Sequence, residues 1–325
     1  MRLVVALGGN ALDANTRAGE RARLTHTVQQ LGDLCLAGHE VIVTHGNGPQ
    51  VGELLLDQEA RIGRGRARPL RLDVLVAMTQ AQLGYLLQQA LITELRGRGA
   101  DRGVVAVVTQ VVVAVDDPAF SRPTKPIGPR YDQRQPGSDN WARTSDGRWR
   151  RVVPSPTPQA VVERDALRAI VADGIVPICG GGGGVPVVAT GARLRGVEAV
   201  VDKDTTSALI ASDLEADTLL ILTDVDAVHV GHGTPDARPL ARLTVGDARD
   251  IVASGEAGAG SMGPKLLAAA RAAEEGRGAV ICRLGEAGAG LAGAAGTTVV
   301  PGPASGEYRR SAGEVGSDGT GERRA

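Results

Sequence analysis

Short runs of apolar, largely β-branched residues recur along this 325-residue chain, and helical patterns separate them. Between the first two runs, Leu24, Val28 and Leu31 recur at helical spacing before Gly38. A strand that is apolar at every position belongs in a parallel sheet covered by helices on both faces, so the alternation predicts the α/β class. The predicted strands are Leu3–Leu7, His39–Thr44, Val104–Val108, Gly174–Ile178, Ala199–Val201, Thr218–Leu222 and Ala279–Cys282.

Two segments interrupt this rhythm. Residues 116–158 are rich in Pro, Arg and Asp, and they hold four of the six aromatic residues: Phe120, Tyr131, Trp141 and Trp149. So many aromatic side chains in a short insert predict a small satellite core, with a disordered loop as the alternative. Residues 303–325 are rich in Gly, Ser, Arg and Glu with almost nothing to bury, so a disordered tail is expected there.

Composition excludes several classes of protein. The longest apolar stretch, Val104–Val115, is interrupted by Thr109 and Gln110 and falls short of the roughly 18 residues a membrane helix needs. The opening apolar segment is too short for a signal peptide, and three isolated cysteines suit a reducing cytoplasm. A net charge of −1 and few aromatic residues argue against nucleic acid as a partner.

Glycine-rich turns follow three of the predicted strands. Gly8-Gly9-Asn10 follows the first, Gly46 to Gly52 the second, and Gly180–Gly184 are five consecutive glycines. In α/β sheets ligands bind beyond the carboxyl ends of the strands, and such turns aim backbone N–H groups at anions. Any one of these turns is explained by steric need alone, but three together indicate a phosphate or carboxylate site.

Lysine is rare in this chain. Only Lys125, Lys203 and Lys265 occur among 36 Lys and Arg residues, so arginine serves wherever a generic surface cation suffices. Lysine and arginine are not interchangeable, because lysine is a compact point charge on a flexible stem. We therefore interpret the three lysines as positions that require that point charge; chance retention is the alternative.

The surroundings of two lysines favour anion binding. Lys265 lies in the first turn of a helix bracketed by Pro264 and Gly276, where a cation opposes the helix dipole unless an anion binds there. Lys125 lies between two prolines that stiffen the insert and would present its ammonium group over a cleft. The alternative is that both lysines are solvated surface charges.

Lys203 is flanked by Asp202 and Asp204, directly before a helical pattern. Flanking carboxylates are a way of holding a phosphate-binding lysine in position. Alternatively, Asp204 serves only as a helix N-cap and Lys203 only pairs with its neighbours.

Other motifs are weaker. No P-loop or kinase-type His-Arg-Asp loop occurs. The turn from Gly46 to Gly52 resembles a dinucleotide fingerprint with one residue too many, and Asp73 lies at about the right distance, which leaves an NAD-type oxidoreductase as a competing hypothesis. His229 and His232 form a potential metal pair with no third ligand nearby, so we predict no metal site there.

At this point the residues resemble the carbamate kinases of the amino-acid-kinase family. The similarity runs from Leu3 to about Pro301. The motifs, in family order, are VVALGGNAL, THGNGPQVG, LVAMTQAQLGY, VTQVVV, PTKPIGP, WRRVVPSP, GGGGVPVV, GVEAVVDKD, LLILTDVDAV and GSMGPK. PTKPIGP and WRRVVPSP frame the insert, which separates carbamate kinases from other kinases of this fold. Asp224 stands where many carbamate kinases have glycine.

The resemblance implies a three-layer αβα sandwich with an open, mainly parallel sheet and a protruding insert. It implies a carbamate lobe over residues 1–212 that carries the insert at about 116–158, and a nucleotide lobe over 213–302. The activity would be reversible phosphoryl transfer between MgATP and carbamate, running toward ATP in arginine and carbamoyl phosphate catabolism. The enzyme would be a cytoplasmic homodimer. A kinase of another small carboxylic acid and a non-catalytic nucleotide sensor remain alternatives.

The resemblance also assigns roles to residues. Lys203 would stabilise charge on the transferring phosphoryl group, Asp204 would orient Lys203, and Lys125 would close from the insert onto carbamoyl phosphate. The expected substrate-binding residues are Gly8, Gly9, Asn10, Gly46, Asn47 and Gly48. The expected nucleotide-binding residues are Lys265, Ser261, Met262, Gly263, Thr223 and Asp224. Mg²⁺ would be carried by ATP or ADP, with no protein metal site.

Overall fold

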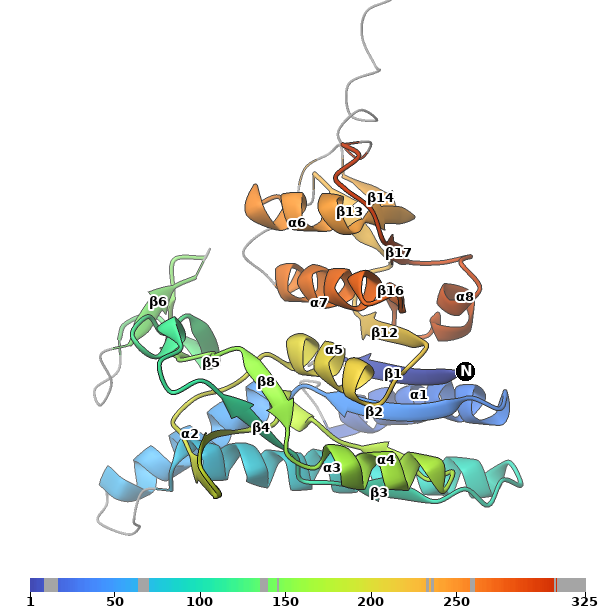
Figure 1. Cartoon of the computed structure of the whole chain (residues 1–325). Helices are drawn as coiled ribbons and strands as arrows, with labels where there is room; N and C mark the ends of the chain where they lie inside the picture. Colours follow the sequence, from blue (N-terminus) through green and yellow to red (C-terminus); the bar gives the residue numbers. More distant parts are fainter. Residues whose placement is uncertain are drawn as a thin grey trace, which may run out of the picture.

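The computed structural model describes residues 1–8, 17–63, 70–134, 140–144, 146–231, 234, 237–257, 261–306 and 308. A central sheet of eight strands organises this part of the chain (Figure 1). The strands, from edge to edge, are β15 (Arg242–Thr244), β17 (Thr297–Val300), β16 (Gly278–Arg283), β12 (Thr218–Thr223), β1 (Arg2–Leu7), β2 (Glu40–His45), β9 (Val176–Ile178) and β3 (Val104–Ala106). Only β16 and β17 pair antiparallel within it.

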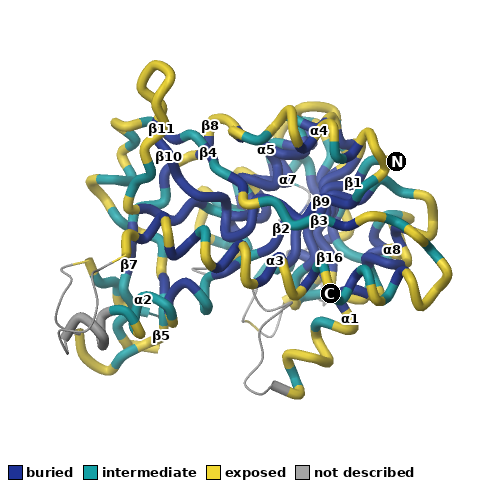
Figure 2. Tube along the Cα trace, turned by 90° about the horizontal axis from the view of Figure 1, so that it is seen from below, coloured by how far each residue is buried: buried dark blue, intermediate teal, exposed yellow. Residues whose placement is uncertain are grey.

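Helices cover both faces of this sheet. Val4 and Ala6 of β1 face one core, whereas Leu3, Val5 and Leu7 face the other, and all five are fully buried. The first face carries α4 (Arg164–Ala172), α5 (Lys203–Asp213), α6 (Val245–Ala253) and α7 (Met262–Glu274). The second face carries α1 (Arg17–Leu36), α3 (Leu72–Gly97) and α8 (Ala287–Leu291). Figure 2 shows the buried strands between these layers. The predicted αβα sandwich is confirmed.

One predicted strand is wrong. Residues Ala199–Val201 are buried but belong to no sheet. The amide of Ala199 donates to the carbonyl of Val197, and that of Val200 donates to Pro154 in the insert. Apolar content was therefore a sign of burial at this place, and these two backbone bonds do not form a strand ladder.

Smaller sheets flank the main one. A four-stranded sheet has the order β11 (Arg193–Gly196), β10 (Val185–Thr190), β4 (Gln110–Val113) and β8 (Pro158–Val161). A hairpin joins β13 (Val228–Val230) to β14 (Arg238–Leu240). The remaining elements are α2 (Gly48–Gly63), the short 3₁₀ turns η2 (Pro118–Phe120) and η3 (Gly181–Gly183), and the insert strands β5 (Lys125–Tyr131), β6 (Trp141–Arg143) and β7 (Trp149–Val153). Within the described residues, no helix has the length and apolar character to cross a membrane.

The insert is folded where it is described. Its strands form the sheet β5-β7-β6, and Tyr131 packs edge-on against Trp141 with 5.6 Å between ring centres. Arg134 lies 4.2 Å from the centre of the Trp149 ring. Phe120 was expected in the satellite core of the insert, but it packs against the core that contains Val4 and Ala6. Residues 135–139 and 145 lie outside the described residues.

The beginning of the expected tail is fixed to the second half of the chain. Asp247, at the start of α6, accepts hydrogen bonds from the amides of Ser305 and Gly306 at 2.8 and 3.0 Å. Tyr308 is buried in the core that contains Val4 and Ala6, with 3% of its surface exposed. These residues differ from the expected disorder because Tyr308 gives the segment an apolar anchor. Residues 309–325 lie outside the described part of the chain.

Candidate active site

The carboxyl ends of parallel strands β1, β2, β9 and β12 meet at one edge of the sheet. There the amide of Gly8, directly after β1, donates to Leu222 at the end of β12. Thr223 is half-buried and Asp224 exposed immediately beyond that point. The edge therefore brings Gly8 beside Thr223, two residues 215 positions apart. Gly9 and Asn10 lie outside the described residues.

The second glycine turn lies at the same edge. The amide of Gly46 donates to Leu7 at 3.3 Å, and α2 begins at Gly48. Asn47 is buried, and its side-chain amide donates to Thr79 of α3 at 2.8 Å. This bond holds Asn47 in a fixed orientation at the edge.

The glycine run 180–184 closes onto Asn47. A Cβ atom at Gly182 would lie 2.1 Å from the Asn47 side-chain nitrogen, and one at Gly183 would lie 2.3 Å from the carbonyl oxygen of Val201. Both glycines have φ in the left-handed region, at +62° and +90°. Only glycine allows this loop to lie between the second turn and the segment that leads into Lys203.

Lys203, Asp204 and Lys265 form a buried cluster between the first turns of α5 and α7. The Asp204 carboxylate lies 2.8 Å from Lys203 Nζ and 3.2 Å from Lys265 Nζ. The exposed fractions are 8% for Lys203, 3% for Asp204 and 4% for Lys265. Two positive charges thus share one carboxylate, which leaves the cluster with one positive charge in excess.

Lys203 has hydrogen-bonding capacity left over. Its Nζ atom is buried, and within the described residues the one partner within 3 Å that the structure gives it is the Asp204 carboxylate at 2.8 Å, so three N–H donors face a single ion-pair partner. Burial lowers the pKa of Lys203, Asp204 opposes that shift, and Lys265 adds to it. A buried ammonium group with unused donors predicts an acceptor from outside the chain.

Lys125 reaches the same helix from the insert. Its ammonium group lies 2.5 Å from Asp202, whose other oxygen accepts from the amides of Asp204 and Thr205. Asp202 is thus the N-cap of α5, and the alternative that Asp204 is the cap is wrong. All three lysines therefore meet at the beginning of α5. Asp202 was not among the expected site residues.

His45 is a further group that the sequence did not single out. It ends β2, is buried, and packs against the glycine run, where a Cβ at Gly181 would lie 2.6 Å from its ring. Burial lowers the pKa of His45 to about 4; its bond to the Gly46 carbonyl opposes the shift and Lys203 adds to it. The ring is neutral at physiological pH and adds no charge to the site.

The expected nucleotide-binding residues lie at the start of α7. Ser261 is exposed and precedes the helix, Met262 is half-buried, and Gly263 is buried. Lys265 Nζ lies 3.4 Å from the Ser261 carbonyl oxygen, which connects this turn to the lysine cluster. Thr223 ends β12 and Asp224 follows it, and their nucleotide role stays a prediction.

The dinucleotide hypothesis finds no support in the geometry. Gly52, the last glycine of that turn, lies inside α2, and a Cβ there would lie 2.2 Å from the Gly128 Cα atom in β5. The glycine is therefore explained by the close approach of the insert to α2. Asp73 is buried in the first turn of α3 and pairs with Arg71, so it does not follow a strand in the chain as the fingerprint requires.

Metal-binding clusters are not evident in the part of the chain that the structure describes. No group of three or more His, Cys, Asp or Glu side chains is placed to hold an ion there. His229 lies 3.2 Å from Asp226, and His232 lies outside the described residues.

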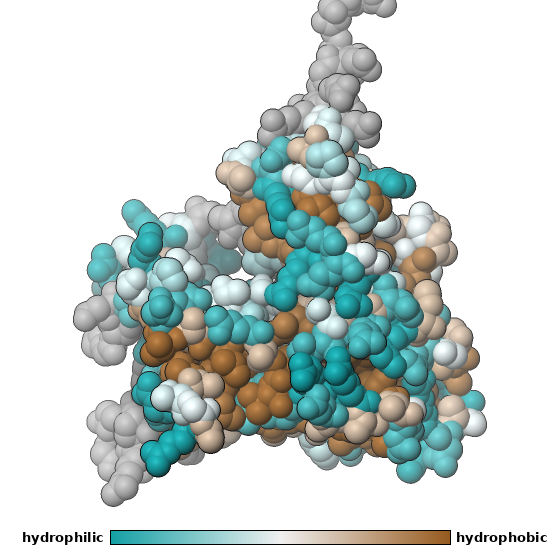
Figure 3. Space-filling view, viewed as in Figure 1, coloured by the Kyte–Doolittle hydropathy of each residue, from teal (hydrophilic) through white to brown (hydrophobic). Residues whose placement is uncertain are grey.

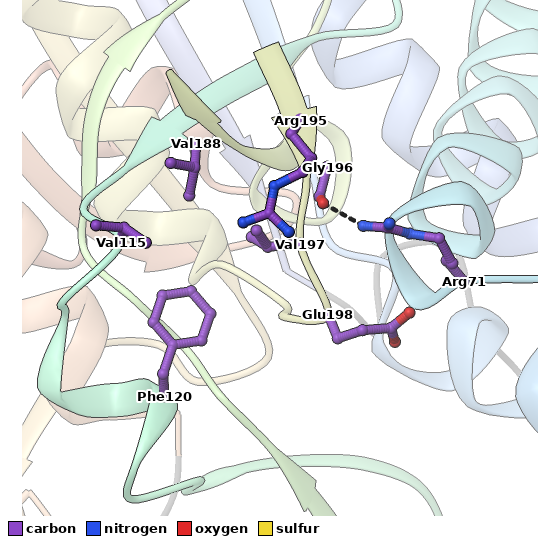
Figure 4. Close-up of a pocket in the computed structure, with 8 residues that line it drawn as sticks. All are labelled: Arg71, Val115, Phe120, Val188, Arg195, Gly196, Val197 and Glu198. Atoms are coloured by element: carbon purple, nitrogen blue, oxygen red, sulfur yellow. Dashed lines mark hydrogen bonds between the residues drawn. The ribbon is translucent and has the colours of Figure 1, made fainter. Parts of the chain in front are cut away.

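A separate hollow of about 380 Å³ is lined by residues of β10, β11 and neighbouring segments. Figure 3 shows that apolar residues gather over β4 and β8 on one face of the molecule. Figure 4 shows Phe120 and three valines around the hollow, with Arg195 directed inward and Arg71 held by the carbonyl of Gly196. None of the residues expected to bind substrate or nucleotide lines it. The hollow is distinct from the lysine cluster.

Glycine turns at the carboxyl ends of parallel strands and three converging lysines are typical of a phosphoryl-transfer protein of the α/β class. The model of the amino acid kinase family matches residues 1–283, and the chain belongs to this family. The chain is 42% identical to a carbamate kinase of Pyrococcus furiosus and 47% identical to one of Halobacterium salinarum, each over 92% of this chain and at least 98% of the relative. A solved carbamate kinase from Giardia lamblia bound to AMP-PNP is 32% identical, with a TM-score of 0.83 over 93% of this chain and 98% of that one.

Proposed function

We propose that the protein is a carbamate kinase, which transfers a phosphoryl group reversibly between carbamoyl phosphate and ADP. The observation that carries this proposal is the buried cluster in which Lys203 and Lys265 share the one carboxylate of Asp204, which leaves one positive charge in excess. Phosphoryl transfer needs little besides positioning and positive charge, which is what this site supplies. The carbamate kinases named above support the choice of substrate.

The charge balance of the site suits an anion. Lys125, Lys203 and Lys265 contribute three positive charges against two from Asp202 and Asp204, and the beginnings of α5 and α7 add the positive ends of two helix dipoles. In the ATP-forming direction, the bond between phosphorus and the carbamate oxygen breaks while a terminal ADP oxygen bonds to phosphorus. Lys203 and Lys265 would stabilise the charge on the transferring group and the nucleotide phosphates.

No general base is required, because both the carbamate oxygen and the ADP oxygen are already anionic. Buried His45, neutral above a pKa of about 4, would therefore shape the site and not transfer a proton. The fixed Asn47 and the backbone of the glycine turns would position the substrate, with Gly8, Gly9, Asn10, Gly46 and Gly48 retaining their expected roles.

Mg²⁺ would arrive with the nucleotide. Asp202 and Asp204 already face lysines, so neither carboxylate is free to form a dedicated metal site. The ion would supply positive charge between nucleotide phosphate oxygens. In this proposal residues 1–212 hold the acceptor and 213–302 the nucleotide, and the lobes share one sheet because β1 pairs with β12.

We also propose a homodimer. The helix α3 exposes Val74, Met78 and Tyr85, which recur at helical spacing and are 40%, 43% and 59% exposed. A second copy of the chain is the occupant we assign to this stripe. The wild type should sediment as a dimer, and Tyr85→Glu should shift it toward monomer; a monomeric wild type at micromolar concentration would contradict the assignment.

A cytoplasmic location is proposed from the cysteines. Cys35, Cys179 and Cys282 are free and buried, and burial raises the pKa of Cys179 to about 12, which keeps its thiol unreactive. Cell fractionation tests the location.

The deciding experiment measures ATP formed from carbamoyl phosphate and MgADP by the purified protein. We expect activity above a no-enzyme control and its loss in Lys203→Ala. A folded wild-type protein with no activity would refute the proposal. A panel of small carboxylic acids with MgATP tests the alternative acceptor, and nucleotide binding without turnover on any of them would indicate a sensor.

A further inference from the structure

The carboxylate of Asp202 belongs to two structures at once. Its Oδ2 atom lies 2.5 Å from Lys125 Nζ, and the two residues are 77 positions apart, one at the start of β5 and the other at the N-cap of α5. Its Oδ1 atom accepts from the amides of Asp204 and Thr205 at 2.9 and 3.2 Å. One side chain thus fixes both the first turn of α5 and the lysine of the insert.

The two carboxylates of this helix divide the lysines between them. Asp204 pairs with Lys203 and Lys265, whereas Asp202 pairs with Lys125. The Lys125 and Asp202 side chains are 29% and 19% exposed, so this pair borders the buried cluster and is still accessible to a ligand. Burial would raise the pKa of Asp202, but Lys125 and the helix amides outweigh it and hold that pKa below its ordinary value. The carboxylate is therefore charged at neutral pH.

The backbone of the insert is already fixed near Lys125. Three residues further along β5, Gly128 packs directly on Gly52 of α2. The lysine side chain is the flexible part that remains, and ordering such a side chain costs conformational entropy. A partner that orders it before substrate arrives removes that cost from the binding step.

We propose that Asp202 is a positioning residue that ties Lys125 of the insert to the first turn of α5, so that Lys125 and Lys203 present their donors to one anion together. Lys125 has three N–H donors and gives one to Asp202, which leaves two for phosphoryl oxygens. This inference rests on the proposed function only for the identity of the anion.

Two variants separate positioning from helix capping. Asp202→Asn and Asp202→Ser both keep a good N-cap but remove the negative charge that holds Lys125. We expect kcat/KM for carbamoyl phosphate to fall about tenfold in each, mainly through a higher KM. The matched control is Asp146→Asn, because Asp146 pairs with Arg130 and Arg148 inside the insert and reaches neither helix. The control should keep wild-type kinetics.

The decisive measurement is a double-mutant cycle with Lys125→Ala. If Asp202 acts through Lys125, Asp202→Asn should change kcat/KM less than twofold when Lys125 is already absent. If Asp202 serves only as a cap, Asp202→Asn should leave kcat/KM nearly unchanged even when Lys125 is present. A tenfold loss in both backgrounds would instead mean that Asp202 acts independently of Lys125, and either result would overturn the proposal.

NMR of the lysine side chains tests the same link without any activity, because the chain has only three lysines. Asp202→Asn should increase the mobility of the Lys125 side chain, measured by ¹³C relaxation at its Cε atom, while the α5 amides keep wild-type protection from hydrogen exchange. Unchanged relaxation at Lys125 would also overturn the proposal. If the wild type lacks kinase activity but shows this relaxation response, the proposed function fails and the link between Asp202 and Lys125 stands.

Discussion

Replacement of Asp204 by asparagine should lower the free energy of unfolding, and the structure predicts by how much. Asparagine has nearly the same shape, so the change removes a charge without leaving a cavity. Lys203 and Lys265 would then lie buried within about 3 Å of a neutral group, at the present distances of 2.8 and 3.2 Å. Breaking a buried ion pair by removing one partner costs about 3–5 kcal/mol.

The upper end of that range has a physical limit. A lysine relieves the penalty by losing its proton, and at pH 7 that costs an ordinary lysine roughly 4.6 kcal/mol. We therefore expect the free energy of unfolding of Asp204→Asn to fall by about 3–5 kcal/mol. Urea unfolding followed by circular dichroism and by intrinsic fluorescence measures this, and coincident curves validate the two-state treatment.

The control replaces an exposed carboxylate of similar contact distance. Glu274 lies 2.6 Å from Arg249 but is 43% exposed, so Glu274→Gln should cost less than about 1 kcal/mol. Inorganic phosphate should also raise the melting temperature of Asp204→Asn more than that of the wild type, because the anion replaces the lost charge. A loss below 1 kcal/mol for Asp204→Asn, or an equal phosphate response, would refute the reasoning about the cluster.

Three further predictions concern other parts of the site. Lys203→Arg keeps the charge but not its compact shape, so kcat should fall about 100-fold. Retained turnover in the ATP assay would remove its assigned role. Burial lowers the pKa of His45 from 6.5 to about 4, so the unfolded state takes up this proton at a higher pH than the folded state. The His45 contribution to stability should therefore fall by about 3 kcal/mol from pH 6.5 to 4 in denaturant titrations, and His45→Gln should lose that much less over the same range. Gly52→Ala should push β5 from α2 and raise KM for carbamoyl phosphate severalfold, whereas Gly97→Ala, which meets nothing within 4 Å, should not; equal kinetics would contradict the close approach.

Much of the fold was predictable because a strand that is buried on both faces is apolar at successive positions. Strand β1 is apolar at every core position since its alternate side chains enter two different cores. The same signal failed at Ala199–Val201, where buried residues form a connecting segment. Apolar content reports burial, and only the presence of a neighbouring strand makes a buried segment a strand.

The site was predictable in its residues but not in its pairings. The rarity of lysine identified Lys125, Lys203 and Lys265 as special, and the structure places all three at the start of α5. Nothing in the local sequence distinguishes Asp202 from Asp204, because both flank the same lysine. Their separate roles depend on whether the insert or α7 lies opposite.

The sequence by itself determined the class of fold and the kind of chemistry, since periodicity and residue type are local properties. Tertiary structure alone decided which charges share a partner and how deeply His45 is buried. It also decided that Gly52 contacts Gly128 of the insert, which leaves no room for a side chain at position 52. Those features arise from contacts between segments far apart in the chain. Their energies depend on distance and burial, which the order of residues does not state.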